Sequence, residues 1–371
     1  MRWYGNPEDE ERPVSVNVSL FTLGVLAFGP VRRMNEAMLY DRLSEDRVRC
    51  NVCSHRCTIE RGHRGICAVR ENVDGRLVSL VYGRLIARDV DPIEKKPLYH
   101  FYPGTRAYSI ATVGCNFTCR NCQNAYISQY PRDHGGRIVG DPAASAEIIA
   151  DAVGGGCRSI AYTYSEPTVA LEFVLECMRA AKDEGLANVW VSNGYFTRET
   201  ADLILPFLDG INVDLKGITN DVYHEISGGN VRPVLDTIER LWGAGVWVEV
   251  TTLVIPGLND SDDELRWTAE AIRGVSPEIP WHVSRFFPAY RLIDRSPTPV
   301  ETLERASEIG RDVGLLHVYL GNVPGEGEET RCPVCGSRLI RRSGYLIRES
   351  RVRGGACPDC DAPLAGRFLP A

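Results

Sequence analysis

Three cysteines, Cys115, Cys119 and Cys122, lie within eight residues that follow the apolar stretch 108–113. Four thiolates close a four-iron four-sulfur cluster, whereas three thiolates in a short loop hold three irons and leave the fourth open to a ligand or substrate. A structural zinc site is the alternative, but it needs a fourth ligand that this loop does not offer. The spacing C-x3-C-x2-C therefore favours a catalytic cluster with an open iron.

A second group of four cysteines precedes this loop in the chain. Their spacing, C-x2-C-x3-C-x9-C, indicates a closed metal site formed by Cys50, Cys53, Cys57 and Cys67. Zinc and an auxiliary iron-sulfur cluster both satisfy this spacing, and the residue types do not choose between them. Unligated buried cysteines are the alternative, which four cysteines so close together make less favourable.

A third group near the C-terminus consists of two C-x2-C pairs, Cys332 with Cys335 and Cys357 with Cys360. Two such pairs around a hairpin, expected here at 338–350, are typical of a zinc ribbon, and a rubredoxin-like iron site is the alternative. The ribbon is rich in arginine, including Arg341 and Arg342. We expect these arginines to form a solvated face, with a docking surface for an acidic protein or RNA as the second hypothesis.

Between 99 and 325, short apolar segments alternate with helical patterns, which is typical of a parallel α/β fold. The segment 168–184 has apolar residues at helical spacing, which places Cys177 in the core, and Cys157 is expected to pack at the start of a strand. The expected strands are 109–113, 159–164, 188–192, 211–215, 247–255, 281–286 and 316–320.

In parallel barrels, the chemistry gathers where the strands end. Polar residues follow the expected strands at 162–167, 192–195 and 214–217. A structural ion pair is the alternative for any lysine or aspartate in such a place. The candidate catalytic residues on the substrate side are Asp214, Lys216, His282 and Arg285, with Tyr290 beside them.

The cysteine loop at 115–122 resembles the cluster motif of the radical S-adenosylmethionine (SAM) superfamily. The resemblance implies that the open iron binds the amino and carboxylate groups of SAM. It also implies that the reduced cluster splits SAM into methionine and a 5′-deoxyadenosyl radical, which takes hydrogen from a substrate. A protein such as a ferredoxin or flavodoxin would deliver the electron.

From about residue 34 to 371, the chain is similar to the pyruvate formate-lyase activating enzyme branch, and more narrowly to the AmmeMemoRadiSam system radical SAM enzymes. The cysteines at 50–67, the runs DPIEKKPLYHF at 91–101 and TYSEPT at 163–168, and the C-terminal cysteine pairs carry this resemblance. It implies radical formation on a protein glycine and AMMECR-like or Memo-like partner proteins. Radical modification of RNA or a small molecule, and a non-catalytic iron-sulfur scaffold, are the alternatives.

Matching by position, the resemblance implies that Ser165 and Glu166 bind the amino group of SAM and that Asn193 meets its ribose or carboxylate. Ile255 and its neighbours would pack on adenine. The chain departs from the family at Asn121, because an aromatic residue usually precedes the last cluster cysteine. A backbone contact with adenine survives this change, whereas side-chain packing on the ring does not.

The expected architecture is a partial parallel (β/α) barrel at 99–325, with a cysteine-rich metal-binding module at 34–98, a zinc-ribbon-like module at 326–371 and an N-terminal extension at 1–33. Thirteen cysteines, most of them in short-range clusters, predict a reducing, cytoplasmic location. The apolar stretch 14–28 is short for a membrane span, so no membrane partner is expected. A net charge of -7 makes nucleic acid a less favoured partner.

Overall fold

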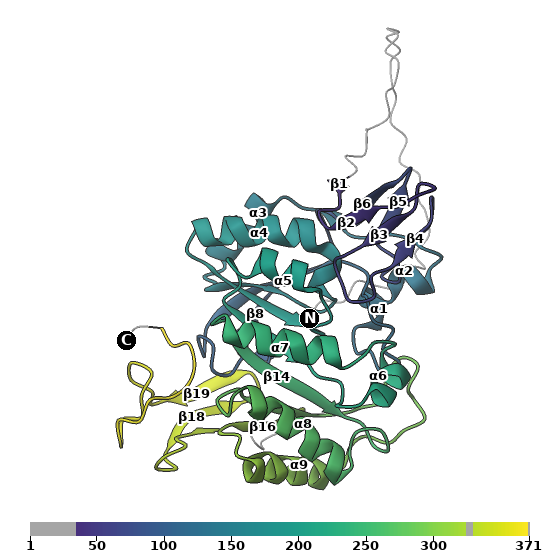
Figure 1. Ribbon diagram of the computed structural model, residues 1–371. Coiled ribbons are helices and arrows are strands. Elements are labelled where there is room, and N and C mark those ends of the chain that lie inside the picture. Colours follow the sequence, from purple (N-terminus) through teal and green to yellow (C-terminus); the bar gives the residue numbers. More distant parts are fainter. Residues whose placement is uncertain (1–34, 324–328, 370–371) are drawn as a thin grey trace, which may run out of the picture. The chain divides into compact units, whose positions relative to one another are not determined.

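The computed structural model of the protein describes residues 35–323 and 329–369 (Figure 1). The residues on the two sides of the expected boundary between 98 and 99 belong to the same unit. The expected extension at 1–33 and the boundary between 325 and 326 lie outside the described residues.

An eight-stranded sheet forms the centre of the protein, in the order β16-β15-β14-β13-β12-β11-β9-β8. Neighbouring strands from β9 to β16 run parallel, and β8 pairs antiparallel with β9 at one edge. The parallel α/β class is thus confirmed, whereas closure into a partial barrel stays a prediction. The strands are β8 (Ala87–Pro92), β9 (Arg106–Ala111), β11 (Ser159–Tyr162), β12 (Ala187–Ser192), β13 (Gly210–Asp214), β14 (Trp247–Val254), β15 (Trp281–Arg285) and β16 (Val318–Gly321).

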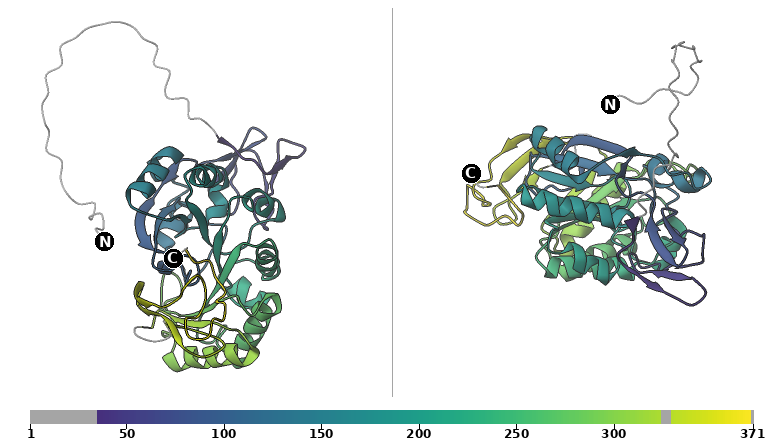
Figure 2. Two further views of the ribbon diagram at one scale, coloured as in Figure 1. Left: turned by 90° about the vertical axis from the view of Figure 1, so that its left-hand side faces the viewer. Right: turned by 90° about the horizontal axis from the view of Figure 1, so that it is seen from above.

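Helices connect the parallel strands and pack on the sheet, with α4 against β11 and β12, α7 against β14, and α9 against β15 and β16 (Figures 1 and 2). Cys157 and Cys177 are both buried in the core, as expected. None of the helices in the described residues is long and apolar enough to cross a membrane. The helices are α1 (Ala125–Ser128), α2 (Tyr130–Asp133), α3 (Ser145–Gly154), α4 (Leu171–Asp183), α5 (Arg198–Ile204), α6 (Asn220–Ile226), α7 (Arg232–Gly243), α8 (Asp262–Val275) and α9 (Val300–Val313), with 3-10 turns η1 (Ile93–Lys95) and η2 (Pro167–Ala170).

The two faces of the sheet belong to different apolar clusters. Ile160 and Tyr162 of β11 join the core that α4 covers, whereas Ala161 between them joins a second cluster with Leu98 and Phe101. Successive side chains of a strand point to opposite faces, so the segment around 93–101 covers the face that the helices leave. The DPIEKKPLYHF run is therefore part of the inner packing of the sheet.

Short strands outside the central sheet form small antiparallel sheets, and the first cysteine group lies in and between strands of this part of the chain. β1, β6 and β5 form one sheet, β2, β3 and β4 form another, and β7 pairs with β10. These strands are β1 (Asn35–Glu36), β2 (Tyr40–Arg42), β3 (Val48–Cys50), β4 (Thr58–Ile59), β5 (Arg70–Val73), β6 (Arg76–Ser79), β7 (Arg84–Leu85) and β10 (Asp141–Pro142).

The C-terminal ribbon contains β17 (Thr330–Arg331), β18 (Arg338–Ser343) and β19 (Leu346–Ser350), and the expected hairpin is the pair of β18 and β19. Arg342 does not lie on a solvated face, contrary to expectation. Its guanidinium is buried, donates to the carbonyl of Tyr99 at 2.7 Å and lies 4.0 Å from the buried carboxylate of Glu94. The position of Arg342 in the strand turns its side chain inward, whereas Arg341 beside it is exposed.

We expect Arg342→Met to lower the free energy of unfolding by about 3–5 kcal/mol, because it leaves the Glu94 carboxylate buried without its cation. Arg341→Met is the matched control and should change stability by no more than about 0.5 kcal/mol. Urea unfolding followed by circular dichroism measures both. Equal stability of the two variants would contradict an anchoring role for Arg342.

Candidate functional site

The three cysteines at 115–122 lie in the loop between β9 and α1, at the C-terminal edge of the parallel sheet. The loop turns at Gly114, which has a φ of 96°. A Cβ atom at this position would lie 2.5 Å from Val69 and 3.1 Å from the carbonyl oxygen of Cys67, so only glycine fits. The segment around Cys67 thus packs directly against the start of the cysteine loop.

The three cysteines are half-buried, and the sulfurs of Cys115 and Cys122 receive contacts from the loop and from α1. The amide of Phe117 donates to the sulfur of Cys115 at 3.4 Å, and the Ser128 hydroxyl lies 3.1 Å from the sulfur of Cys122. Burial raises the pKa of Cys115, and it raises the pKa of Cys119 to about 12. Ligation by cationic iron reverses this preference for the thiol form, so loading the site releases protons.

Two further observations bear on the fit of a cluster to this loop. Among the described residues, the Nδ2 atom of Asn116 and the Oδ1 atom of Asn121 are buried without a hydrogen-bond partner. The three sulfurs also do not converge on a single-ion site of the kind found in the C-terminal ribbon. Each thiolate of a four-iron cluster binds a different iron, so separated sulfurs and unused polar atoms suit a cluster.

Glu166, directly before η2, is the polar centre beside this loop. Its buried carboxylate accepts hydrogen bonds from the Thr168 amide at 3.1 Å, the Ser192 hydroxyl at 2.9 Å and the Asn193 amide at 2.9 Å. Burial raises the pKa of Glu166, and these hydrogen bonds oppose the rise. The carboxylate therefore joins the segments that follow β11 and β12.

Asn193 connects this carboxylate to the cysteine loop. Its Nδ2 atom donates to the side chain of Asn116 at 2.7 Å and lies 3.9 Å from the sulfur of Cys115. Its Oδ1 atom accepts from the amide of Tyr195. The structure thus brings Glu166 and Asn193 next to the predicted cluster, although their contacts with SAM stay predictions.

Ser165 follows an unusual backbone position, because Tyr164 has a φ of 64°. The Ser165 hydroxyl donates to the carbonyl of Thr112 at 2.6 Å, which joins the ends of β11 and β9. The Tyr164 hydroxyl donates to Asp91, whose carboxylate also accepts from Lys96 at 2.6 Å. The inner segment that covers the sheet therefore supports the residue before Ser165.

Asp214 and Lys216 lie at and just after the end of β13, as expected, and their charges act on Cys119, although their catalytic roles stay predictions. Their side chains form an ion pair of 2.8 Å, and the Lys216 carbonyl accepts from Asn259. Burial lowers the pKa of Lys216, but the charge of Asp214 and its hydrogen bond raise that pKa by more, so the net shift is upward. The lysine is therefore a stable cation near Cys119, suited to an anionic group.

His282 does not follow a strand end and is a correction to the sequence analysis. It is the second residue of β15, and its Nε2 atom lies 2.6 Å from the buried carboxylate of Glu249. The same carboxylate accepts from the amides of Tyr99 and His100 and from the indole of Trp247. These four groups fill the hydrogen-bonding capacity of the Glu249 carboxylate. His282 therefore belongs to a buried structural network and not to the strand-end site.

Arg285 and Tyr290 lie at or after the end of β15, as expected, but their side chains bind the protein. The Nε atom of Arg285 donates to the carbonyl of Thr298 at 2.7 Å. The Tyr290 hydroxyl donates to the carboxylate of Asp133 in α2 at 2.9 Å. These contacts hold the loop after β15 together and join it to α2, and catalytic roles for the two residues stay predictions.

Ile255 follows β14 and is 1% exposed. It packs in a small apolar cluster, so its side chain can contact a bound adenine only if the residues of this cluster move apart. Its buried partners are Val222, Ile226, Phe286 and Leu292.

Several residues of the site were not found from the sequence. Asn116, Thr168 and Ser192 complete the contacts of Glu166 and Asn193. Asn116 lies inside the cysteine motif and Thr168 ends the TYSEPT run, so both motifs contained the signal. From the sequence, Asp91 and Lys96 were recognised only as members of a family motif. Their contacts with Tyr164 could not be predicted, because these contacts form only in the folded sheet.

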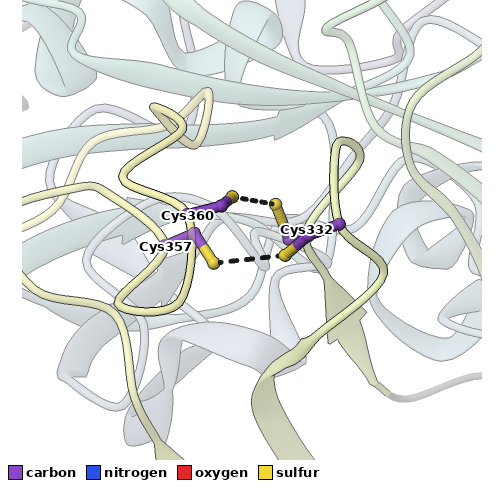
Figure 3. A group of neighbouring side chains, drawn as sticks. Cys332, Cys357 and Cys360 are labelled. Carbon is purple, nitrogen blue, oxygen red and sulfur yellow. Dashed lines mark hydrogen bonds between the residues drawn. The ribbon is translucent and has the colours of Figure 1, made fainter.

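The C-terminal cysteines form a closed four-sulfur site (Figure 3). Sulfur pairs Cys332 with Cys360 and Cys335 with Cys357 are each 3.7 Å apart, and all four sulfurs lie within 4.8 Å of one another. Zinc–sulfur bonds of about 2.3 Å place the corners of a tetrahedron about 3.8 Å apart. The predicted single-ion geometry is therefore present, and the geometry does not distinguish zinc from iron.

Comparison with known proteins agrees with this geometry. Residues 109–268 match the model of the radical SAM superfamily. An uncharacterized protein of Methanocaldococcus jannaschii is 44% identical over 311 residues, which cover 83% of this chain and 92% of that protein. The chain belongs to the radical SAM superfamily.

More distant similarities accompany this match. The pyruvate formate-lyase 1-activating enzyme of Escherichia coli (strain K12) is 26% identical over 228 residues, covering 56% of this chain and 86% of that enzyme. The structure of Streptococcus suis SuiB bound to S-adenosylmethionine has 12% identity and a TM-score of 0.47, covering 62% of this chain and 53% of that one. The superfamily implies a four-iron cluster and SAM, and the cysteine loop is the part of this radical SAM protein that fits them.

We expect Glu166→Gln to weaken SAM binding by about tenfold or more. A glutamine amide would face the Asn193 amide donor to donor, and a hydrogen bond to a charged acceptor contributes about 1.5–3 kcal/mol. Anaerobic equilibrium dialysis of the cluster-loaded protein measures the affinity. The exposed Glu60→Gln is the control, and equal affinity of the two variants would contradict the positioning role.

We expect the contribution of Asp91 to the free energy of unfolding to be lost at acid pH. Burial raises the pKa of Asp91, but Lys96, Lys95 and Tyr164 lower it more, so the folded-state pKa is below its unfolded value of about 3.9. The stabilisation is therefore present above that pH and is lost as the pH falls below it. The difference in unfolding free energy between the native chain and Asp91→Asn should shrink from pH 7 to pH 3.

Urea unfolding at the two pH values measures this difference. The exposed Asp141→Asn serves as the control, because its difference from the native chain should stay small at both. If the difference in unfolding free energy between the native chain and Asp91→Asn were the same at pH 7 and pH 3, the ion pairs of Asp91 would contribute nothing to stability.

Proposed function

We propose that this radical SAM protein cleaves SAM reductively at a cluster held by Cys115, Cys119 and Cys122 and forms a radical on a protein substrate. The observation that carries the proposal is the meeting of the half-buried thiols with Asn193 and the Asp214–Lys216 pair at one edge of the sheet. When bound and reduced, the cluster supplies one electron to the sulfonium of SAM, which breaks into methionine and a 5′-deoxyadenosyl radical.

The residues of the chain bind and orient the reactants. Glu166 holds Asn193 against the cysteine loop. In this position, Asn193 is placed to contact the ribose or carboxylate of SAM. Ser165 fixes the ends of two strands beside it. Lys216 keeps its charge next to Cys119 and offers an ammonium group to a carboxylate or another anionic group.

The name of the Escherichia coli relative, an activating enzyme of pyruvate formate-lyase, supports a protein as the substrate. We infer hydrogen abstraction from a glycine of that protein, with a ferredoxin or flavodoxin as the one-electron donor. The narrower assignment to the AmmeMemoRadiSam system, its AMMECR-like or Memo-like partners and the cytoplasmic location stay predictions. Zinc is the ion proposed for the C-terminal site, with iron as the alternative.

The test is the formation of methionine and 5′-deoxyadenosine after anaerobic cluster loading, reduction and addition of SAM. The native chain and the buried control Cys157→Ala should form both products, and Cys119→Ala should reduce them by at least about a hundredfold. A native chain with a loaded, reduced cluster that leaves SAM intact would favour the scaffold alternative. Products together with a bound tRNA or metabolite would favour RNA or small-molecule modification.

A further inference from the structure

The structure contains two groups of four cysteines whose sulfurs are arranged differently. In the C-terminal group, all four sulfurs lie within 4.8 Å of one another, as a single tetrahedral ion requires. Among the described residues, the group of Cys50, Cys53, Cys57 and Cys67 does not reach this geometry, although all four residues line the same cavity. Cysteines that surround a common space without bringing their sulfurs to one point suit ligands of four separate irons.

The cavity between these four cysteines is apolar and shielded. Its other walls include Val52, Ile59 and Val169. A closed cluster excludes water from its irons, and this environment provides that exclusion.

A buried cation lies against the same cavity. Arg70 is 2% exposed, lines the cavity and forms a two-pronged ion pair with Glu172, with nitrogen–oxygen distances of 3.0 and 2.7 Å. Among the described residues, its Nε atom has no hydrogen-bond partner. An unused N–H group on a buried guanidinium is suited to the sulfur of an anionic thiolate cluster.

The cavity is also next to the SAM cluster loop. The carbonyl of Cys67 packs against Gly114, and the guanidinium of Arg132 donates both to the carbonyl of Ile66 and to that of Cys115. The backbone of Cys53 also forms a bridge with Phe196, in the segment after β12. The two cysteine groups are thus linked by the Arg132 guanidinium and by the close approach of the Cys67 carbonyl to Gly114.

We propose that Cys50, Cys53, Cys57 and Cys67 hold a closed four-iron four-sulfur cluster that relays single electrons to the neighbouring SAM cluster. Four cysteine ligands leave no open iron, so this cluster transfers electrons and does not bind substrate. It gains one electron from an external iron-sulfur or flavin protein and is reoxidised as the SAM cluster gains that electron. The relay rests on the proposed function, whereas the identity of the cluster does not.

The test of identity is the content of acid-labile sulfide, iron and zinc in the full chain after anaerobic reconstitution. Two clusters give about eight sulfides per chain, and the triple variant Cys115→Ala, Cys119→Ala, Cys122→Ala should keep about four. The variant Cys53→Ala should also keep about four, and Cys157→Ala should match the native chain. Counting sulfide removes any contribution of a lone iron in the C-terminal site, which contains no sulfide.

A zinc site in place of the cluster would give a different result. The native chain would then hold about four sulfides and about two zinc ions, and the triple variant would hold no sulfide. That outcome would overturn the proposal. Because the native count alone separates the two cases, the test survives a failure of either variant to fold.

Electron paramagnetic resonance of the reduced protein tests the relay. Two reduced clusters in neighbouring loops should broaden each other's signals, so the native spectrum should differ from the sum of the spectra of the two single-cluster variants. A native spectrum equal to that sum, in a chain that contains both clusters, would overturn the relay and leave the cluster assignment intact.

Discussion

The buried carboxylate of Glu166 is the interaction on which the site depends. A carboxylate removed from water is costly unless donors surround it, and the donors here come from η2 and from the end of β12. Satisfying one acidic group therefore fixes the relative positions of two strand ends. Asn193 carries this constraint to Cys115, so the arrangement of the sheet edge determines the arrangement of the cysteine loop.

A similar principle operates on the inner face of the sheet. Asp91 gathers Lys96, Ser109 and Tyr164, and Glu249 gathers two backbone amides, an indole and His282. Each buried acid joins the segment at 91–101 to several strands. These polar contacts set the position of the segment more specifically than apolar packing alone, because each donor must meet its acceptor at a defined distance.

The features that the sequence predicted are those encoded over short distances along the chain. The seven parallel strands of the central sheet and the C-terminal sulfur site follow from apolar runs and from cysteine spacing, whereas the antiparallel edge strand β8 was not predicted. The role of His282 could not be predicted, because its partner Glu249 is far away in the chain and meets it only through the pairing of β14 with β15. The burial of Arg342 was missed for the same reason, because its partners, the Tyr99 carbonyl and Glu94, are far away in the chain.

The buried position of Arg342 has a consequence for how the protein is made. Synthesis proceeds from the N-terminus, so Glu94, Tyr99 and every cysteine of the SAM cluster loop leave the ribosome before Arg342 does. A nascent chain that ends before β18 would contain the complete cysteine loop, but its Glu94 carboxylate would lack the guanidinium of Arg342. Completion of the chain and consolidation of its fold are thus coupled, and premature products are left less stable and open to proteolysis.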